Sequence, residues 1–129
     1  MISFPTEALE LLRTGIPDLQ ALWLFGSRAG EACRPDSDWD LAFLAKTPLG
    51  GWQLLDLRAR LSAAMDSEVD LVDLRNGSTV LAIEVLRADR LLLDLDPFAR
   101  ETFEMRTLTR YQDLNEARKG ILEDLGMAA

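Results

Sequence analysis

Residues 24–44 decide the fold of this chain, and they read LFGSRAGEACRPDSDWDLAFL. An apolar run ends at Gly26 and Ser27, a polar segment follows, and Asp38 and Asp40 stand at the start of a second apolar run. Side chains two positions apart on a strand point to the same face. We therefore predict two strands joined by a polar loop, with Asp38 and Asp40 on one face and the alternate apolar residues packed on the other.

This pattern of residues suits a divalent cation and a phosphate. Mg²⁺ prefers hard oxygen ligands, usually one or two protein carboxylates together with substrate phosphate oxygens. Gly26 allows the backbone to approach a phosphate, and Ser27 adds a hydroxyl and an N–H. A short helix predicted over residues 28–32 would direct its free N–H groups at the same anion. The motif therefore predicts a nucleoside triphosphate held for phosphoryl or nucleotidyl transfer.

A third carboxylate is needed to complete the metal shell or to accept the proton of an attacking hydroxyl. Asp70 and Asp73 lie on the next predicted strand, and their opposite parity allows only one of them to face Asp38 and Asp40. Asp70 lies inside an apolar run, where an unpaired carboxylate is costly, whereas Asp73 lies near the strand end, where we expect a solvated acid. We therefore assign Asp70 as the base or metal ligand. Whether Asp73 replaces or assists Asp70 stays open.

Composition limits the alternatives. The chain has 129 residues, enough for one small domain, and 48% hydrophobic residues, enough for a packed core. The net charge of −8 argues against direct binding to nucleic acid, which requires Lys and Arg on the phosphates. The same charge suits a basic protein partner. There is no histidine and a single cysteine, Cys33, so Ser-His-Asp chemistry, Cys-His nucleophiles and a disulfide within the chain are excluded.

The order of predicted elements gives the fold class. We expect an α/β (α+β) domain with no membrane span and no signal peptide, and hence a cytoplasmic protein. Residues 1–93 are assigned to the catalytic core and residues 94–129 to a C-terminal helical segment of the same compact domain. Predicted helices cover residues 5–14, 52–65, 78–86 and 97–125, and predicted strands cover residues 21–25, 38–44, 69–74 and 91–93.

Gly26-Ser27, ten residues, and then Asp38-x-Asp40 resembles the signature of the DNA-polymerase-β-type nucleotidyltransferases. The chain is more similar still to the minimal nucleotidyltransferases (MNT), the antitoxins paired with HEPN-domain toxins. Four segments carry that similarity, residues 26–29, 37–41, 69–74 and 111–114. One position departs from the pattern Gly-Ser-x-x-x-Gly of many relatives, because the second glycine here is Gly30 and Glu31 follows it.

The resemblance implies a fold, an activity and a partner. The fold is a small mixed sheet with helices mostly on one side. The activity is that of a type VII HEPN–MNT antitoxin, a Mg²⁺-dependent transfer of AMP from ATP to a hydroxyl, expected to be a tyrosine, of the cognate HEPN ribonuclease toxin. It assigns Asp38, Asp40 and Asp70 as catalytic residues and metal ligands, and Gly26, Ser27 and Arg28 to the nucleotide phosphates.

The C-terminal segment carries an amphipathic stripe with helical spacing. The stripe packs back on its own domain, forms a homodimer or docks a helical partner, which in the family is the HEPN toxin. Its candidate docking residues are Leu108, Tyr111, Leu114, Ile121, Leu122 and Leu125.

Three functions remain open from the sequence. The chain is either an adenylyltransferase or a non-catalytic module that neutralises a toxin by covering its surface. A third reading is a nucleotidyltransferase that acts on a small hydroxylated molecule, although 129 residues leave little chain for a dedicated pocket.

Overall fold

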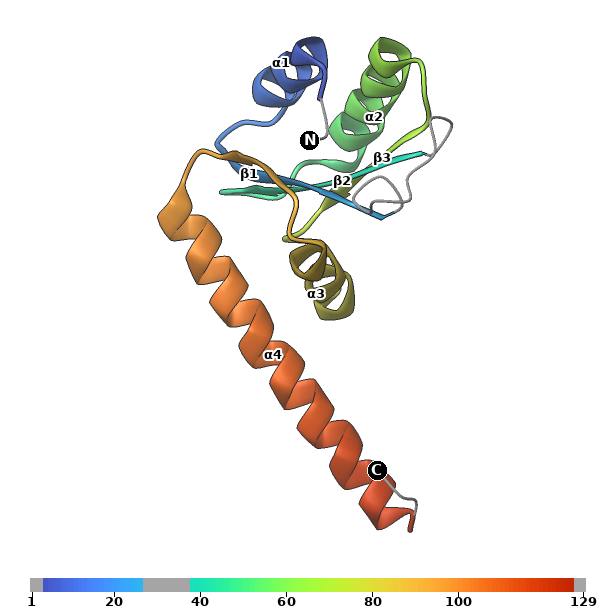
Figure 1. Cartoon of the computed structure of the whole chain (residues 1–129), viewed down its shortest axis with the longest axis vertical. Helices are drawn as coiled ribbons and strands as arrows, with labels where there is room; N and C mark the ends of the chain where they lie inside the picture. The colour runs from blue at the N-terminus through green and yellow to red at the C-terminus, as the bar shows by residue number, and fades with distance from the viewer. Residues whose placement is uncertain (1–3, 27–37, 127–129) are drawn as a thin grey trace.

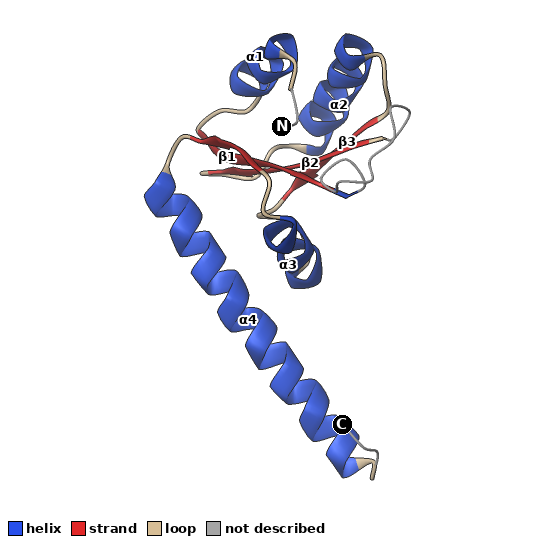
Figure 2. Ribbon diagram, viewed as in Figure 1, coloured by secondary structure: helices blue, strands red, loops and turns tan. Residues whose placement is uncertain are grey.

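The computed structural model describes residues 4–26 and 38–126. The described residues form four α-helices and four β-strands, and Figure 1 shows them along the chain while Figure 2 distinguishes helices from strands. In chain order the elements are α1 (Thr6–Gly15), β1 (Leu19–Phe25), β2 (Trp39–Ala45), α2 (Gly51–Met65), β3 (Val69–Asp73), α3 (Thr79–Ala88), β4 (Leu91–Asp94) and α4 (Pro97–Asp124).

The four strands form one mixed sheet in the order β3-β2-β1-β4. Strand β1 pairs antiparallel with β2 and with β4, whereas β2 pairs parallel with β3. The central strands β1 and β2 are almost wholly buried, as expected for strands covered on both faces. The predicted α+β domain with a small mixed sheet is therefore confirmed.

Helices cover both faces of the sheet. Helices α1 and α2 lie on one face, over a core that includes Leu22, Leu41 and Phe43. Helix α3 lies on the opposite face, over Trp23 and Leu44, and Phe103 of α4 joins this second cluster. The expectation of helices mostly on one side was wrong, because alternate residues of β1 and β2 are apolar in both directions and each face needs its own cover.

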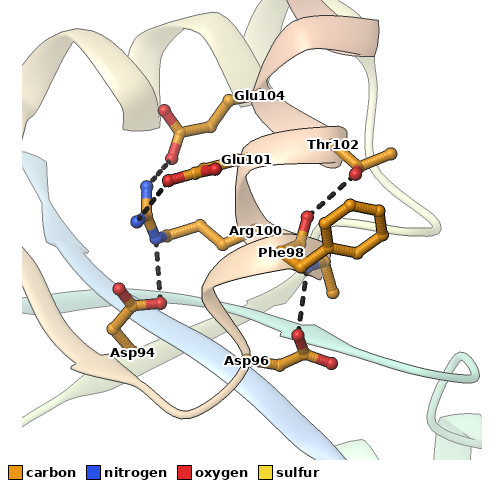
Figure 3. Close-up of polar contacts among 8 residues, drawn as sticks. Asp94, Asp96, Phe98, Arg100, Glu101, Thr102 and Glu104 are labelled. Carbon is orange, nitrogen blue, oxygen red and sulfur yellow. Dashed lines mark hydrogen bonds and ion pairs between the residues drawn. The ribbon is translucent and has the colours of Figure 1, made fainter.

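Helix α4 begins against the sheet and then leaves it. Arg100 donates to Asp94 Oδ1 at 2.9 Å and pairs with Glu104 one turn further on, which ties the first turns of α4 to the end of β4 (Figure 3). These two hydrogen bonds raise the pKa of the Arg100 guanidinium above its ordinary value. Asp96 caps the helix by accepting from the Ala99 N–H at 3.1 Å. The C-terminal half of α4 runs out beyond α3 and the sheet (Figure 1).

In the described part of the chain, no helix combines the length and the apolar character that a transmembrane span needs.

Candidate active site

The register of the sheet brings two of the predicted carboxylates together. Phe25, the last residue of β1, is the partner of Asp40 on β2, and Asp40 is the partner of Asp70 on β3. Paired residues on neighbouring strands point to the same face, so Asp40 and Asp70 lie side by side. Trp39, next to Asp40, turns the other way into the core beneath α1 and α2. This alternation is the one that the sequence predicted.

Gly26 fits tightly against Asp40. Its φ of +72° lies in the left-handed region, where a side chain is strained. A Cβ built at this position would lie 2.2 Å from Asp40 Oδ2 and 2.9 Å from Asp40 Cγ. The position therefore requires glycine for its backbone conformation and for the space that the carboxylate occupies. This close approach places the glycine turn at the end of β1 directly against the candidate metal ligand.

Three negative charges of the described residues act on the Asp40 carboxyl. Burial raises the pKa of the Asp40 carboxyl above its ordinary value, and the neighbouring charges of Asp70, Asp38 and Glu84 raise it further. Asp38 is exposed and precedes β2 by one residue. Glu84, on α3, was missed by the sequence reasoning, since nothing in its local pattern shows that α3 faces Asp40. A bound cation would relieve the repulsion among these carboxylates, so their arrangement favours cation binding.

Asp70 is less buried than predicted. Its side chain is 48% exposed and forms an ion pair with Arg58 of α2 at 2.9 Å. The prediction treated Asp70 as an acid within a buried run, but β3 is the edge strand of the sheet, so this face is open beside it. Arg58 holds the Asp70 carboxylate at the edge next to Asp40.

Asp73 has the opposite environment from the one predicted. It is buried, and its two carboxylate oxygens accept the backbone N–H of Leu49 at 2.9 Å and of Arg75 at 3.1 Å. The expectation of a solvated acid at a strand end was wrong, because the loop before α2 folds over this end of β3. Asp73 points to the face opposite Asp70, as the parity argument required, and it ties two loops to the sheet.

The donor set fits Mg²⁺ as a partial site. In residues 4–26 and 38–126, no group of three or more acidic, histidine or cysteine side chains is close enough to hold a metal ion by itself. Mg²⁺ usually takes only one or two protein carboxylates and fills its octahedral shell with water and phosphate oxygens. Asp38 and Asp40, with Asp70 beside them, supply hard oxygen ligands of that kind.

Several predicted contacts fall on residues 27–37, which lie outside the described part of the chain. These are the phosphate contacts of Ser27 and Arg28, the short helix over residues 28–32, and the effect of Gly30 and Glu31 on the loop. They remain predictions.

The predicted docking stripe lies on α4. Leu108, Leu114, Ile121 and Leu125 are exposed, whereas Tyr111 and Leu122 are partly buried. The Tyr111 hydroxyl accepts from Arg87 of α3 at 3.4 Å. The stripe thus contacts its own domain at Tyr111, and it presents exposed apolar side chains both before and after that residue.

A family model described as "Polymerase beta, Nucleotidyltransferase" matches residues 9–98, which include β1, Gly26, Asp40 and Asp70. The chain belongs to this nucleotidyltransferase family.

Relatives of known activity and structure resemble the chain over most of its length. Protein adenylyltransferase MntA of Shewanella oneidensis is 38% identical over 119 residues, 92% of this chain and 85% of that protein. A crystal structure of a toxin–antitoxin with AMP-PNP has a TM-score of 0.77 at 38% identity, covering 91% and 94% of the two chains. A structure of the tri-AMPylated Shewanella oneidensis HEPN toxin in complex with its MNT antitoxin has a TM-score of 0.72 at 36% identity, covering 92% of each chain. These are minimal members of the nucleotidyltransferase family, as the sequence motif predicted.

Proposed function

We propose that this nucleotidyltransferase is the antitoxin of a HEPN–MNT pair and transfers AMP from ATP to a hydroxyl of its cognate HEPN toxin. The observation that carries the proposal is the packing of Gly26 against Asp40, with Asp70 in register beside it. The resemblance to the nucleotidyltransferases implies that nucleotide and metal bind at this end of the sheet. The similarity to a protein adenylyltransferase and to structures with AMP-PNP and with an AMPylated toxin supports ATP as donor and a protein as acceptor.

Each side chain has a stated role in this proposal. Asp38 and Asp40 would hold Mg²⁺, which when bound neutralises charge on the triphosphate. Gly26 allows the Asp40 carboxylate to pack against the end of β1, and Gly26, Ser27 and Arg28 would contact the phosphates. Asp70 completes the metal shell or accepts the proton of the attacking hydroxyl, and Arg58 keeps its carboxylate in place.

The reaction balances without a further reactant. The hydroxyl oxygen of the acceptor forms a bond to the α-phosphorus of ATP, and the bond from that phosphorus to the bridging oxygen breaks. Pyrophosphate leaves with the bonding electrons, and in the base role Asp70 receives the hydroxyl proton. An attached AMP adds bulk and negative charge, which would exclude RNA from a nearby ribonuclease site.

The domain division belongs to the same proposal. Residues 1–93 would supply the catalytic core, and residues 94–129 would supply a segment that docks the toxin through Leu108, Tyr111, Leu114, Ile121, Leu122 and Leu125. A reaction that consumes ATP fits a cytoplasmic location, which we include in the proposal.

Intact mass spectrometry tests the proposed function. The purified chain is mixed with the HEPN-domain protein encoded beside it, Mg²⁺ and ATP, and the neighbour is weighed next to reactions with EDTA and with the Asp38→Ala/Asp40→Ala variant. We expect the neighbour to gain one or more AMP units in the complete reaction alone. A stable complex with no mass gain would instead favour a binding module, and AMP found only on added small hydroxylated compounds would favour a transferase that acts on small molecules.

A further inference from the structure

A row of side chains spaced four residues apart runs along α4. Residues at i and i+4 of a helix are neighbours, so the row is a continuous ridge about 24 Å long, and it winds partly around the helix because each step of four residues turns it by about 40°. Figure 3 shows its first two members on the side of α4 opposite Arg100, which turns toward Asp94 at the end of β4. We call it the arginine row, and its members are Phe98, Thr102, Arg106, Arg110 and Leu114.

The ends of the arginine row are apolar and exposed. Phe98 is 81% exposed and Leu114 is 50% exposed. Met105, beside Phe98, is also exposed. The row thus has solvent-exposed apolar side chains on both sides of two arginines. This composition is typical of protein interfaces, in which aromatic residues, Met and Arg are enriched.

Hollows flank the arginine row. One of about 340 Å³ lies between α4 and the turn after β3, and Arg75, Arg106 and Arg110 contribute to its lining. A second of about 260 Å³ includes Phe98 and Met105 in its lining. Side chains of a partner that reached down beside the row would enter these hollows.

The arginine row is a local concentration of positive charge in a chain of net charge −8. Among residues 4–26 and 38–126, neither Arg106 nor Arg110 forms an ion pair. Arg75 is fixed beside them, since its Nε–H donates to the Ala45 carbonyl and its Nη2 donates to Gln20 Oε1 at 3.0 Å.

Two carboxylates lie at the margins of the hollows. Glu101, which contributes to the second hollow, is itself 3.8 Å from the Arg100 guanidinium. Asp113 borders a third hollow near Leu114. Neither carboxylate forms an ion pair with the two arginines of the row, which are therefore available to anionic groups of a partner.

We propose that the arginine row docks an acidic, apolar-flanked segment of the partner protein, with carboxylates meeting Arg106 and Arg110 and apolar side chains meeting Phe98 and Leu114. The inference rests on the proposed function, which supplies the partner. A protein segment fits better than nucleic acid, because two arginines neutralise few phosphates and phosphodiesters would gain nothing from the two exposed apolar ends.

The docking surface lies away from the carboxylate site. Arg75 bonds to the last residue of β2, whereas Asp40 is the second residue of that strand. These two positions on β2 are five residues apart, which in an extended strand is about 17 Å. A segment bound on the arginine row would therefore leave the site at Asp40 open, and it would raise the effective concentration of the acceptor hydroxyl there.

Affinity for the HEPN neighbour tests this inference. Binding is measured by calorimetry without nucleotide, so that no transfer takes place, for the wild type, Arg106→Glu/Arg110→Glu and Phe98→Ala/Leu114→Ala. A control variant, Arg13→Glu/Arg60→Glu, makes the same change of net charge at exposed residues of α1 and α2, which cover the other face of the sheet. We expect Kd to rise about tenfold or more for both row variants and by less than about twofold for the control. We also expect the loss from the charge reversal to shrink in high salt.

The other outcomes overturn the inference and separate it from the proposed function. Row variants that bind within about twofold of the control would exclude this surface. Loss of self-association, or of binding to a fluorescent single-stranded RNA, in the charge-reversal variant while the neighbour still binds would assign the row to a second copy or to nucleic acid. AMP transfer by the wild type is scored independently by mass, so a neighbour that binds through the row without being modified would refute only the proposed reaction. Circular dichroism melts confirm that each variant is folded.

Discussion

Replacing Gly26 by alanine should inactivate the enzyme through the position of Asp40. The new Cβ would lie 2.2 Å from Asp40 Oδ2 and 2.9 Å from Cγ, and van der Waals contact requires a separation larger by about 1 Å. The carboxylate is the more mobile partner, so it must rotate or move by about that amount. A displacement of 1 Å at a reacting centre costs on the order of 100-fold in rate.

The same substitution should also destabilise the fold. Alanine at a φ of +72° costs about 1–2 kcal/mol, and relieving the overlap adds to this. We expect the melting temperature to fall by about 3–12 °C. Because the overlap can be relieved by moving the carboxylate, the loss of activity should exceed what unfolding at the assay temperature explains.

Two alanine variants separate the causes. Gly126 has the same φ of +72° with open space around it, and Gly51 lies in open space without a positive φ. Initial rates of AMP transfer, from the mass of the partner over time, should be near wild type for Gly126→Ala and Gly51→Ala. A Gly26→Ala enzyme that transfers AMP within about threefold of wild type would refute the close packing of Gly26 on Asp40.

Three further predictions concern the acids of the sheet. Asp73→Ala leaves the N–H groups of Leu49 and Arg75 without their acceptor, so urea melts should show a loss of about 2–4 kcal/mol; superimposable melts would contradict this role. Asp70→Ala removes a half-exposed side chain, so the same melts should show a loss below about 1 kcal/mol while AMP transfer falls about 100-fold or more; wild-type transfer would place the third acid elsewhere. Burial and then the charges of Asp70 and Asp38 raise the pKa of Asp40. The ionised carboxylate therefore lowers the free energy of unfolding at pH 7. This penalty shrinks as pH falls through the raised pKa, and it is absent below the ordinary value near 3.8. Asp40→Asn should therefore melt above wild type at pH 7 in EDTA, with a difference that closes in acid, and equal melting temperatures at pH 7 would refute the shift.

The sequence predicted the elements well because their signals are local. The run of apolar residues in β1, the Ser78 cap that accepts from the Leu81 N–H at 3.1 Å, and Pro97 in the first turn of α4 all act within a few positions. Parity alone separated Asp70 from Asp73 by face. These features come from strand period, capping and proline geometry, which need no knowledge of the tertiary fold.

The sequence could not predict what depends on contacts between distant segments. Asp73 was expected in solvent and is buried, because the backbone of Leu49, 24 positions away, donates to it. Asp70 was expected within a buried run and instead pairs with Arg58 at an open sheet edge. The presence of Glu84 near Asp40 depends on which face α3 covers, and the expectation of helices mostly on one side gave no reason to consider it.

Covalent inhibition of the partner is the central claim, and one measurement tests it most directly. The HEPN partner is incubated with the chain, Mg²⁺ and ATP, then separated from the chain under denaturing conditions, refolded and assayed for ribonuclease activity, next to a partner treated identically with the Asp38→Ala/Asp40→Ala variant. We predict that the partner treated with wild type carries AMP and stays inactive, whereas the partner treated with the variant recovers full activity. Equal recovery of activity after both treatments would show that neutralisation depends on continued binding and would contradict the account.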